Sequence, residues 1–335
     1  MRPIIVRLPN WVGDVIMSLP TLWHLHQRNY QLLLVGKSWA STLLNGTPWA
    51  VHRLPDSRRD RIQLLRRLRH KARSEDVEFN QRLNMLLLTN SFSSALEARW
   101  AGLKAIGYRQ DGRGWLLRHA HAQPQGIVHE SERFWELGLP LAPVDDRPGA
   151  DVPPCPVPRL PLNRNARQQA QVLLEHQGLA NPAHPESIRP YACLIPFATG
   201  TLNGVGKAWP GFPALCRHLS KYMPVLILPA PGDETSHTRL NYPDARCLTN
   251  VGLDVYAAIL ARAALVVSND TGPGHMAAAV GSRLISVLGP TDARRYRALG
   301  SNVSILQHSP WPSDEFVWKT VNKAIQALQP PLPPA

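Results

Sequence analysis

The sequence predicts an α/β protein built from two doubly wound, parallel-sheet domains that face a cleft. The chain has 335 residues, of which 44% are apolar, and this suits two domains with separate cores. Short apolar runs alternate with helical patterns, which is typical of a parallel sheet covered by helices on both faces. A proline-rich stretch at 140–161 interrupts this alternation and predicts a connection between the domains.

The first half begins with an apolar run at 4–8, which predicts a strand, and a helical pattern over 12–27 follows it. Further strands are predicted at 31–35 and 84–88, and a helix near 91–100. Between them, Ile62, Leu65 and Leu68 have the spacing of an amphipathic helix with a basic outer face.

The second half resumes the same alternation. Strands are predicted at 191–196, 225–228, 264–268 and 283–288, and helices at 165–176, 212–222, 255–262, 275–280 and 314–328. We therefore expect domains at 1–155 and 156–312. We expect residues 313–335 to form a helix and a proline-rich tail that pack back toward the N-terminal domain. The default ligand site is the cleft, because ligands of open α/β sheets bind beyond the carboxyl ends of the strands.

Composition narrows the class of protein. The formal net charge is +13, and a chain this basic usually meets nucleic acid, anionic lipid or a phosphorylated substrate. The four cysteines lack C-x-x-C and zinc-site spacing, which fits a reducing cytoplasm. We find neither the apolar core of a signal peptide nor a run of 18 apolar residues, so we expect no secretion and no membrane span.

The segment 264–280 is the most informative. An apolar strand runs into a polar, glycine-bearing turn, and a helix of small residues is expected to start near His275. A helix N-terminus at the carboxyl end of a strand is a ready site for a diphosphate. The alternative, that Asp270 or Thr271 only caps the helix and the glycines shape a tight turn, stays open.

Two other loops follow predicted strands. Asp14 lies near the start of the first helix, where a carboxylate could remove a proton from an incoming hydroxyl or could simply stabilise the helix N-terminus. The glycine-rich loop 197–210 contains Thr199 and Lys207. This lysine could neutralise a diphosphate leaving group or could be an ordinary solvated side chain.

The stretch 53–73 holds nine Lys or Arg against Asp56 and Asp60 and has no aromatic residue. It could be a solvated helix face, a nucleic-acid-binding surface or a surface that binds an anionic glycolipid. Proteins that bind single-stranded nucleic acid combine basic grooves with aromatic residues that stack on the bases. Because this stretch has no aromatic residue, we favour binding to an anionic membrane surface or acceptor. No metal is predicted, because Asp145 and Asp146 lie in the proline-rich stretch without a nearby histidine.

Together, the segments LPNWVGDVIMSLP, GKAWP and SNDTGPGHMAAAVGSRLISVLGPTD resemble the ADP-heptose:lipopolysaccharide heptosyltransferases, a glycosyltransferase family with the GT-B fold of two Rossmann-like domains. The order and spacing of the three segments agree with that family over nearly the whole chain. The resemblance implies an inverting, metal-independent transfer of heptose from ADP-heptose to a Kdo- or heptose-bearing lipid A core. No covalent sugar–enzyme intermediate is expected.

The resemblance also implies roles for residues. Asp14 would be the general base, and Lys207 would stabilise the diphosphate. The implied donor-binding residues are Thr199, Lys207, Glu234, Asp270, Thr271, Gly272, Pro273, Gly274 and His275, with Glu234 on the ribose. The implied acceptor-binding residues are Asn10, Trp11, Arg58, Arg59, Arg61 and Arg66. No cofactor is implied, since the ADP-sugar is a substrate. The enzyme would work in the cytoplasm, peripherally at the inner membrane, with no nucleic-acid partner.

The sequence departs from the family pattern at two positions. Ala208 stands where a basic residue commonly follows the lysine, and Gly274 stands where a bulkier residue is frequent. These changes leave a different nucleotide-sugar donor as an alternative. A sugar-nucleotide isomerase on the same fold would turn over donor alone. A basic nucleic-acid-binding protein would bind DNA or RNA with steep salt dependence and no nucleotide sugar.

Overall fold

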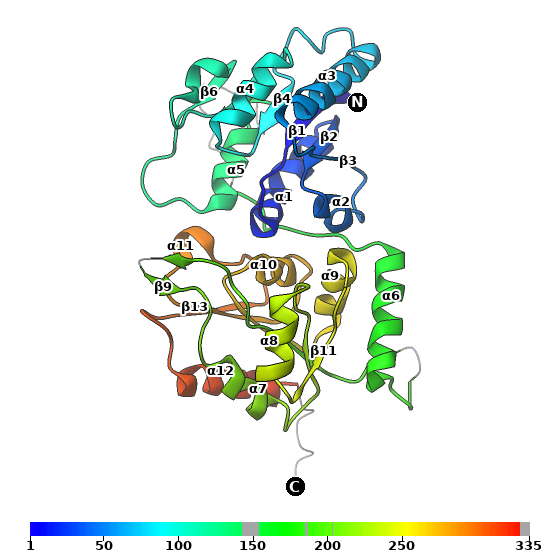
Figure 1. The fold of residues 1–335 in the computed structure, drawn as a ribbon, viewed down its shortest axis with the longest axis vertical. Helices are drawn as coiled ribbons and strands as arrows, with labels where there is room; N and C mark the ends of the chain where they lie inside the picture. The colour runs from blue at the N-terminus through cyan, green and yellow to red at the C-terminus, as the bar shows by residue number, and fades with distance from the viewer. Residues whose placement is uncertain (143–153, 185–186, 203, 329–335) are drawn as a thin grey trace. The chain divides into compact units, whose positions relative to one another are not determined.

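The computed structural model describes residues 1–142, 154–184, 187–202 and 204–328. It divides into two compact units, Met1–Leu160 and Pro161–Ala335, each with its own sheet (Figure 1). Asp145, Asp146 and the proline-rich tail 329–335 lie outside the described residues. Within the described part of the chain, no helix combines the length and the apolar character needed to cross a membrane.

The N-terminal unit has a six-stranded parallel sheet in the order β3-β2-β1-β4-β5-β6. Its strands are β1 (Arg2–Arg7), β2 (Tyr30–Gly36), β3 (Ala50–Arg53), β4 (Met85–Leu87), β5 (Ala105–Tyr108) and β6 (His119–His121). Its helices are α1 (Val12–Gln27), α2 (Trp39–Leu43), α3 (Arg58–Glu75), α4 (Phe92–Trp100) and α5 (Glu130–Gly138), with a 3-10 turn η1 (Arg113–Leu116).

Helices cover both faces of this sheet. Leu64, Leu65 and Leu68 of α3 are buried with Ile5 and other residues of the sheet, because their spacing places them on one side of the helix. Ser57 caps α3 by accepting a hydrogen bond from the backbone N–H of Asp60. The amphipathic basic helix expected in the stretch 53–73 is therefore present.

The C-terminal unit repeats the strand order as β11-β10-β7-β12-β13-β14, again all parallel. The strands are β7 (Ala192–Ile195), β10 (Val225–Ile227), β11 (Ala245–Cys247), β12 (Leu265–Asn269), β13 (Leu284–Leu288) and β14 (Val303–Gln307), and a small hairpin pairs β8 (Thr201–Leu202) with β9 (Val205–Gly206). The helices are α6 (Arg164–Leu174), α7 (Phe212–Leu219), α8 (Asp233–Asn241), α9 (Leu253–Arg262), α10 (Gly272–Ala279), α11 (Ala293–Tyr296) and α12 (Asp314–Gln326).

Helix α12 contributes to the core of the C-terminal unit. Val317, Val321 and Ile325 are buried in the core of the C-terminal unit, together with Phe212 and Leu215 of α7. These three residues repeat at helical spacing and form the apolar stripe of α12, so the helix completes its own unit. The expected packing of residues 313–335 toward the N-terminal domain stays a prediction.

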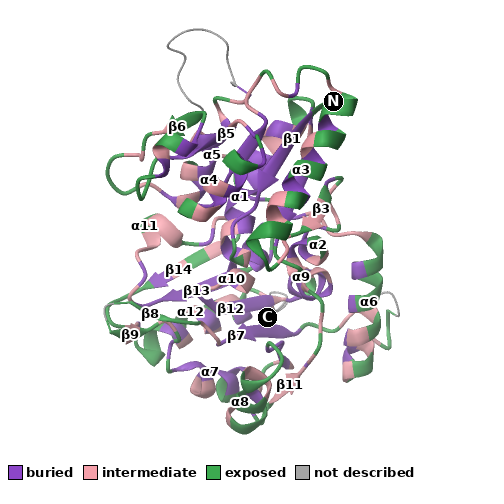
Figure 2. Ribbon diagram, turned by 45° about the horizontal axis from the view of Figure 1, so that its top comes forward, coloured by how far each residue is buried: buried purple, intermediate pink, exposed green. Residues whose placement is uncertain are grey.

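In each unit the strand order reverses once, between β1 and β4 and between β7 and β12. This reversal is where open α/β sheets bind ligands, beyond the carboxyl ends of the strands. Figure 2 shows the strands at both reversals as buried, while the outer sides of α3 and α6 are exposed. The predicted doubly wound α/β fold is confirmed, and it directs attention to the loops that follow these strands.

Candidate active site

The loop after β12 offers the N-terminus of a helix. Helix α10 begins at Gly272, with Pro273 in its first turn, and Thr271 occupies the N-cap without a side-chain hydrogen bond to the helix. The sequence had suggested a start near His275. The earlier start reflects the preference of proline for the first helical turn. Because the first N–H groups of a helix have no partner within it, this uncapped end can bind an anion.

Gly274 is needed for the packing of this helix. A Cβ atom at this position would lie 2.6 Å from Ser268 Oγ and 3.1 Å from the backbone oxygen of Asn269. A contact of 2.6 Å does not occur for real Cβ atoms and one of 3.1 Å is unusually tight, so a larger residue would force the helix, the strand or the Ser268 side chain to shift. The departure from the family pattern at Gly274 is thus matched by a close approach of helix to strand.

Asn269, the last residue of β12, connects this loop to the lysine loop. Its side chain is fully buried, accepts a 2.9 Å hydrogen bond from the backbone N–H of Trp209 and donates a 2.6 Å bond to the carbonyl of Pro196. Asn269 therefore joins the end of β12 to both ends of the segment 196–209, which follows β7. Sequence analysis did not select it. A polar residue that ends a buried apolar strand is the signal that could have done so.

The lysine loop is built on this connection. Lys207 is partly exposed, follows the β8–β9 hairpin and donates its backbone N–H to the carbonyl of Gly200 at 3.3 Å. Trp209, two residues later, is buried and donates its indole N–H to the carbonyl of Pro312 at 3.1 Å. Thr199 lies in the same loop and is exposed. The structure thus brings the predicted Lys207 loop to the end of β12.

Two further donor-site predictions have measurable geometry. His275 Nε2 lies 3.6 Å from Asp270 Oδ1, and both side chains are largely buried. Glu234, in the first turn of α8 beyond β10, accepts a 2.8 Å hydrogen bond at Oε2 from the backbone N–H of Ala230. Glu234 therefore has a local structural role in the turn, beside the ribose contact predicted for it.

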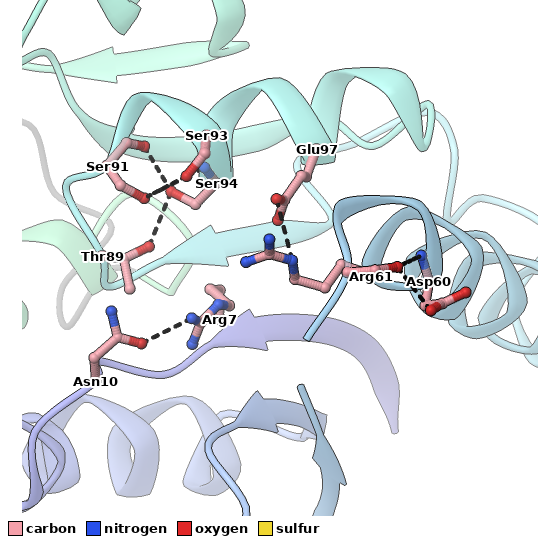
Figure 3. Close-up of polar contacts among 10 residues, drawn as sticks. Arg7, Asn10, Asp60, Arg61, Thr89, Ser91, Ser93, Ser94 and Glu97 are labelled. Carbon is pink, nitrogen blue, oxygen red and sulfur yellow. Dashed lines mark hydrogen bonds and ion pairs between the residues drawn. The ribbon is translucent and has the colours of Figure 1, made fainter. Parts of the chain in front are cut away.

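In the N-terminal unit, the loop after β1 carries the predicted general base. Asp14 is partly buried in the first turn of α1, whose N-cap is the exposed Trp11. Arg7, at the end of β1, donates to the carbonyl of Leu8 and, at 2.8 Å, to Oδ1 of Asn10 (Figure 3). Burial lowers the pKa of Arg7 to about 10, so this guanidinium remains charged at neutral pH.

A buried carboxylate accompanies this arginine. Glu97 of α4 lies with Oε1 3.4 Å from Nε of Arg61 on α3, and both side chains are drawn in Figure 3. Burial raises the pKa of Glu97, while the charges of Arg61 and Arg7 oppose that rise. Arg61 is thus partly buried and paired with a carboxylate, whereas Arg58 and Arg59 are exposed. Sequence analysis missed Arg7 and Glu97, since neither belongs to a motif.

One predicted acceptor residue, Arg66, lies apart from the residues around Arg7 and Glu97. Arg66 donates from Nη2 to the carbonyl of Trp100 at 3.1 Å, at the C-terminal end of α4. Among the described residues, no three His, Cys, Asp or Glu side chains gather in the way that a metal site requires.

Comparison with known proteins decides the class. The sequence profile of glycosyltransferase family 9 (heptosyltransferase) matches residues 66–326 of this chain. The chain belongs to glycosyltransferase family 9. The matched region of this glycosyltransferase includes the lysine loop and the loop after β12, and it begins after Asp14. The predicted enzyme class and family are confirmed.

The similarity of this family 9 enzyme to its relatives extends over most of its length. It is 26% identical over 307 residues to lipopolysaccharide heptosyltransferase 2 of Escherichia coli (strain K12), covering 86% of this chain and 83% of that protein. The structure of E. coli ADP-heptose LPS heptosyltransferase II superimposes with a TM-score of 0.74 at 22% identity, covering 98% and 99% of the two chains. A family 9 glycosyl transferase from Veillonella parvula gives 0.75 at 15% identity, covering 97% of each chain. These two structures share the fold of this enzyme.

Proposed function

We propose that this family 9 glycosyltransferase transfers a heptose from ADP-heptose to the inner core of lipopolysaccharide, on a Kdo- or heptose-bearing lipid A acceptor. The names of its relatives suggest the donor, because they include an ADP-heptose LPS heptosyltransferase. The observation that carries the proposal is the uncapped N-terminus of α10, to which Asn269 ties the Lys207 loop.

The diphosphate of the donor would occupy this place. Backbone N–H groups at the start of α10 would bind its oxygens, and the ammonium group of Lys207 would neutralise the charge that develops as ADP leaves. Preorganised donors of this kind stabilise a leaving group without further rearrangement. The pair His275–Asp270 would hold the loop in position, because each side chain restricts the other.

The transfer would be an inverting, metal-independent displacement. Oxygen of the acceptor hydroxyl forms a bond to the anomeric carbon on the side opposite to the diphosphate. The bond from that carbon to the diphosphate oxygen breaks, and ADP departs with the bonding electrons. The carboxylate of Asp14 takes the proton of the attacking hydroxyl.

The acceptor would be held by basic residues of the N-terminal unit. Arg58 and Arg59 are exposed at the start of α3, and Asn10 and Trp11 are exposed beside Asp14. Cationic side chains bind phosphate and carboxylate groups, which a Kdo-bearing lipid A carries. Because such an acceptor is a lipid, we place the reaction at the cytoplasmic surface of the inner membrane.

A transfer assay with an Asp14→Asn variant tests this proposal. Wild-type protein should convert ADP-heptose and a Kdo-bearing acceptor to ADP and a heptosylated product. The variant should be slower by about 100-fold or more, because asparagine cannot accept the proton. Thermal shifts serve as the control: ADP should raise the melting temperature of both proteins, and of Lys207→Ala less.

Each contrary result has a definite meaning. An Asp14→Asn variant at the wild-type rate would exclude Asp14 as the base. Stabilisation by UDP or GDP in place of ADP would replace the heptose donor by another nucleotide sugar. Turnover of donor without acceptor would favour an isomerase.

A further inference from the structure

A second basic site lies on the N-terminal unit, between the C-terminal half of α3 and the end of α4. A pocket of about 430 Å³ is lined there by Arg66, Arg69, His70, Arg73, Arg99, Trp100, Ala101 and Gly102. The four lining residues of α3 fall at positions i, i+3, i+4 and i+7, so one side of the helix presents all of them to the pocket.

Among the described residues, no carboxylate lines this pocket. None of its lining residues is acidic, whereas Arg61, earlier on the same helix, is paired with Glu97. Two of the arginines are held in place by neutral acceptors, and one of them is Arg66, which donates to the carbonyl of Trp100. Arg69 donates from Nε to Asn80 Oδ1 at 3.0 Å and from Nη1 to the carbonyl of Ala101 at 3.4 Å. These bonds orient the guanidinium groups without neutralising their charge. Oriented, positively charged donors of this kind bind an oxyanion well.

Gly102 makes room for this arrangement. It has a φ of +73°, and a Cβ atom there would lie 2.6 Å from Nη1 of Arg69. The turn that ends α4 therefore approaches the Arg69 guanidinium as closely as a glycine permits.

The pocket is separate from the loops that contain Asp14 and Asn10. Helix α3 starts after the carboxyl end of β3 and runs back toward the amino end of β4, while the turn after α4 leads into the amino end of β5. The pocket therefore lies at the amino-end edge of the sheet, and the base lies at the carboxyl-end edge. At a rise of about 1.5 Å per residue, Arg73 is about 20 Å along α3 from Asp60.

An exposed aromatic side chain lines the pocket. Trp100 is 48% exposed. An indole beside clustered arginines is the composition that proteins use at the interface of an anionic bilayer, where the ring lies at headgroup depth. A site for a small free anion needs no such side chains.

We propose that this pocket binds the phosphate groups of anionic lipid headgroups and thereby docks the enzyme on the membrane surface. The inference rests on the proposed function, since it concerns how an enzyme with a lipid acceptor reaches its substrate. It assigns docking to Arg66, Arg69, Arg73 and Arg99, and leaves the acceptor sugar to the loops at the other edge of the sheet.

Co-sedimentation with vesicles tests the pocket. The vesicles contain phosphatidylcholine alone or with phosphatidylglycerol, and the variants are Arg69→Gln/Arg73→Gln and a control, Arg67→Gln/Lys71→Gln. The control changes two exposed basic residues of the same helix, at the same spacing and with the same loss of charge, outside the pocket. We expect wild type to bind only the phosphatidylglycerol vesicles. The pocket variant should bind them about tenfold or more weakly, and the control about threefold or less.

A second variant distinguishes a loss of vesicle binding from a loss of folding. Arg73→Gln/Arg99→Gln changes two exposed pocket residues and should lose vesicle binding to a similar degree at an unchanged melting temperature. Equal losses in pocket and control variants would overturn the proposal, because general charge would then explain the binding. Wild type that ignores vesicles but is stabilised by inorganic phosphate, or that binds an oligonucleotide through these arginines, would overturn the lipid assignment.

Heptose transfer to a deacylated, water-soluble acceptor separates this inference from the proposed function. The pocket variant should retain the wild-type rate in that assay, because docking is not needed. A pocket variant that loses transfer to the soluble acceptor would place the pocket in acceptor-sugar binding and would overturn the docking role. Failure of wild type itself to transfer would count against the proposed function, while the vesicle result would still decide the pocket.

Discussion

Gly274 controls how closely α10 approaches β12, because its missing side chain leaves room for Ser268 Oγ and the Asn269 carbonyl. The buried polar residues around it are equally specific. Asn269 uses both ends of its amide, and Arg7 donates to Asn10 from a buried position. At this scale a single atom decides whether the loops of the site keep their positions.

Gly274→Ala should therefore lower the free energy of unfolding by about 1–3 kcal/mol, since overpacking forces helix and strand apart. Urea denaturation measures this change. Gly206→Ala is the matched control, because a Cβ atom there meets no heavy atom within 4 Å. A surface change of this kind should stay within about 0.5 kcal/mol. Equal stability of Gly274→Ala and wild type would show that α10 can move without cost.

Some of these residues can be predicted from the sequence and others cannot. Asp14, Lys207 and the residues 270–275 lie in loops that follow strands or in the first turn of the helix after such a loop, so motif and topology point to them together. Arg7, Glu97 and Asn269 were missed because their importance comes from partners distant in the chain, such as Glu97 with Arg61 and Asn269 with Trp209. Pairings of this kind follow from the fold and cannot be found from local spacing.

At the scale of elements, η1 holds the loops after β4 and β5 together. Arg113 is fully buried and donates to the carbonyls of Tyr108 at 2.8 Å, Thr89 at 2.7 Å and Ser91 at 3.2 Å. Burial lowers its pKa to about 10, so the side chain stays protonated at neutral pH. One side chain thus fixes the loop in which Ser91 begins α4.

Arg113→Met should destabilise the N-terminal unit by about 3 kcal/mol, because buried carbonyls lose their donor and regain no water. Unfolding in urea checks this, and Arg109→Met, at an exposed position nearby, is the control. ADP should still raise the melting temperature of the C-terminal unit in Arg113→Met, since the proposed donor site belongs to that unit. An unchanged free energy of unfolding would mean that water takes the place of the guanidinium as hydrogen-bond donor to these carbonyls.

The strength of the apolar pattern explains which elements the sequence predicted. Strands such as β2, β12 and β13 are rich in apolar residues, and α1 was predicted with the bounds that it has. The edge strands β6, with the sequence HAH, and β11, with ARC, were missed because they are short and lack an apolar run. Helix α8, DETSHTRLN, was missed because it lacks a clear apolar stripe.

On the scale of the whole molecule, the chain contains the same strand order twice, each time with one reversal. The sequence shows no short-period repeat that would reveal this, because the two halves share topology and not residues. Each unit has its own buried core, built from separate sets of residues. Stability and donor binding should therefore be separable between the units.

Calorimetry of the full chain should reveal this separation. ADP should raise the temperature of the unfolding transition that Gly274→Ala lowers, because ligand bound to a folded unit stabilises that unit. The transition lowered by Arg113→Met should not move. A single transition that both substitutions lower and ADP raises would show instead that the two cores unfold together.

The hydrogen bonds of Asn269 also bear on enzyme engineering. One amide joins the backbone at Pro196 and Trp209 to the end of β12. The segments 196–209 and 269–275 should therefore be replaced together when either is exchanged for that of another enzyme. A graft of either segment from an enzyme with another donor would leave an amide or a carbonyl without its partner. Grafting both segments together would keep these bonds, so we expect the sheet beneath to stay intact.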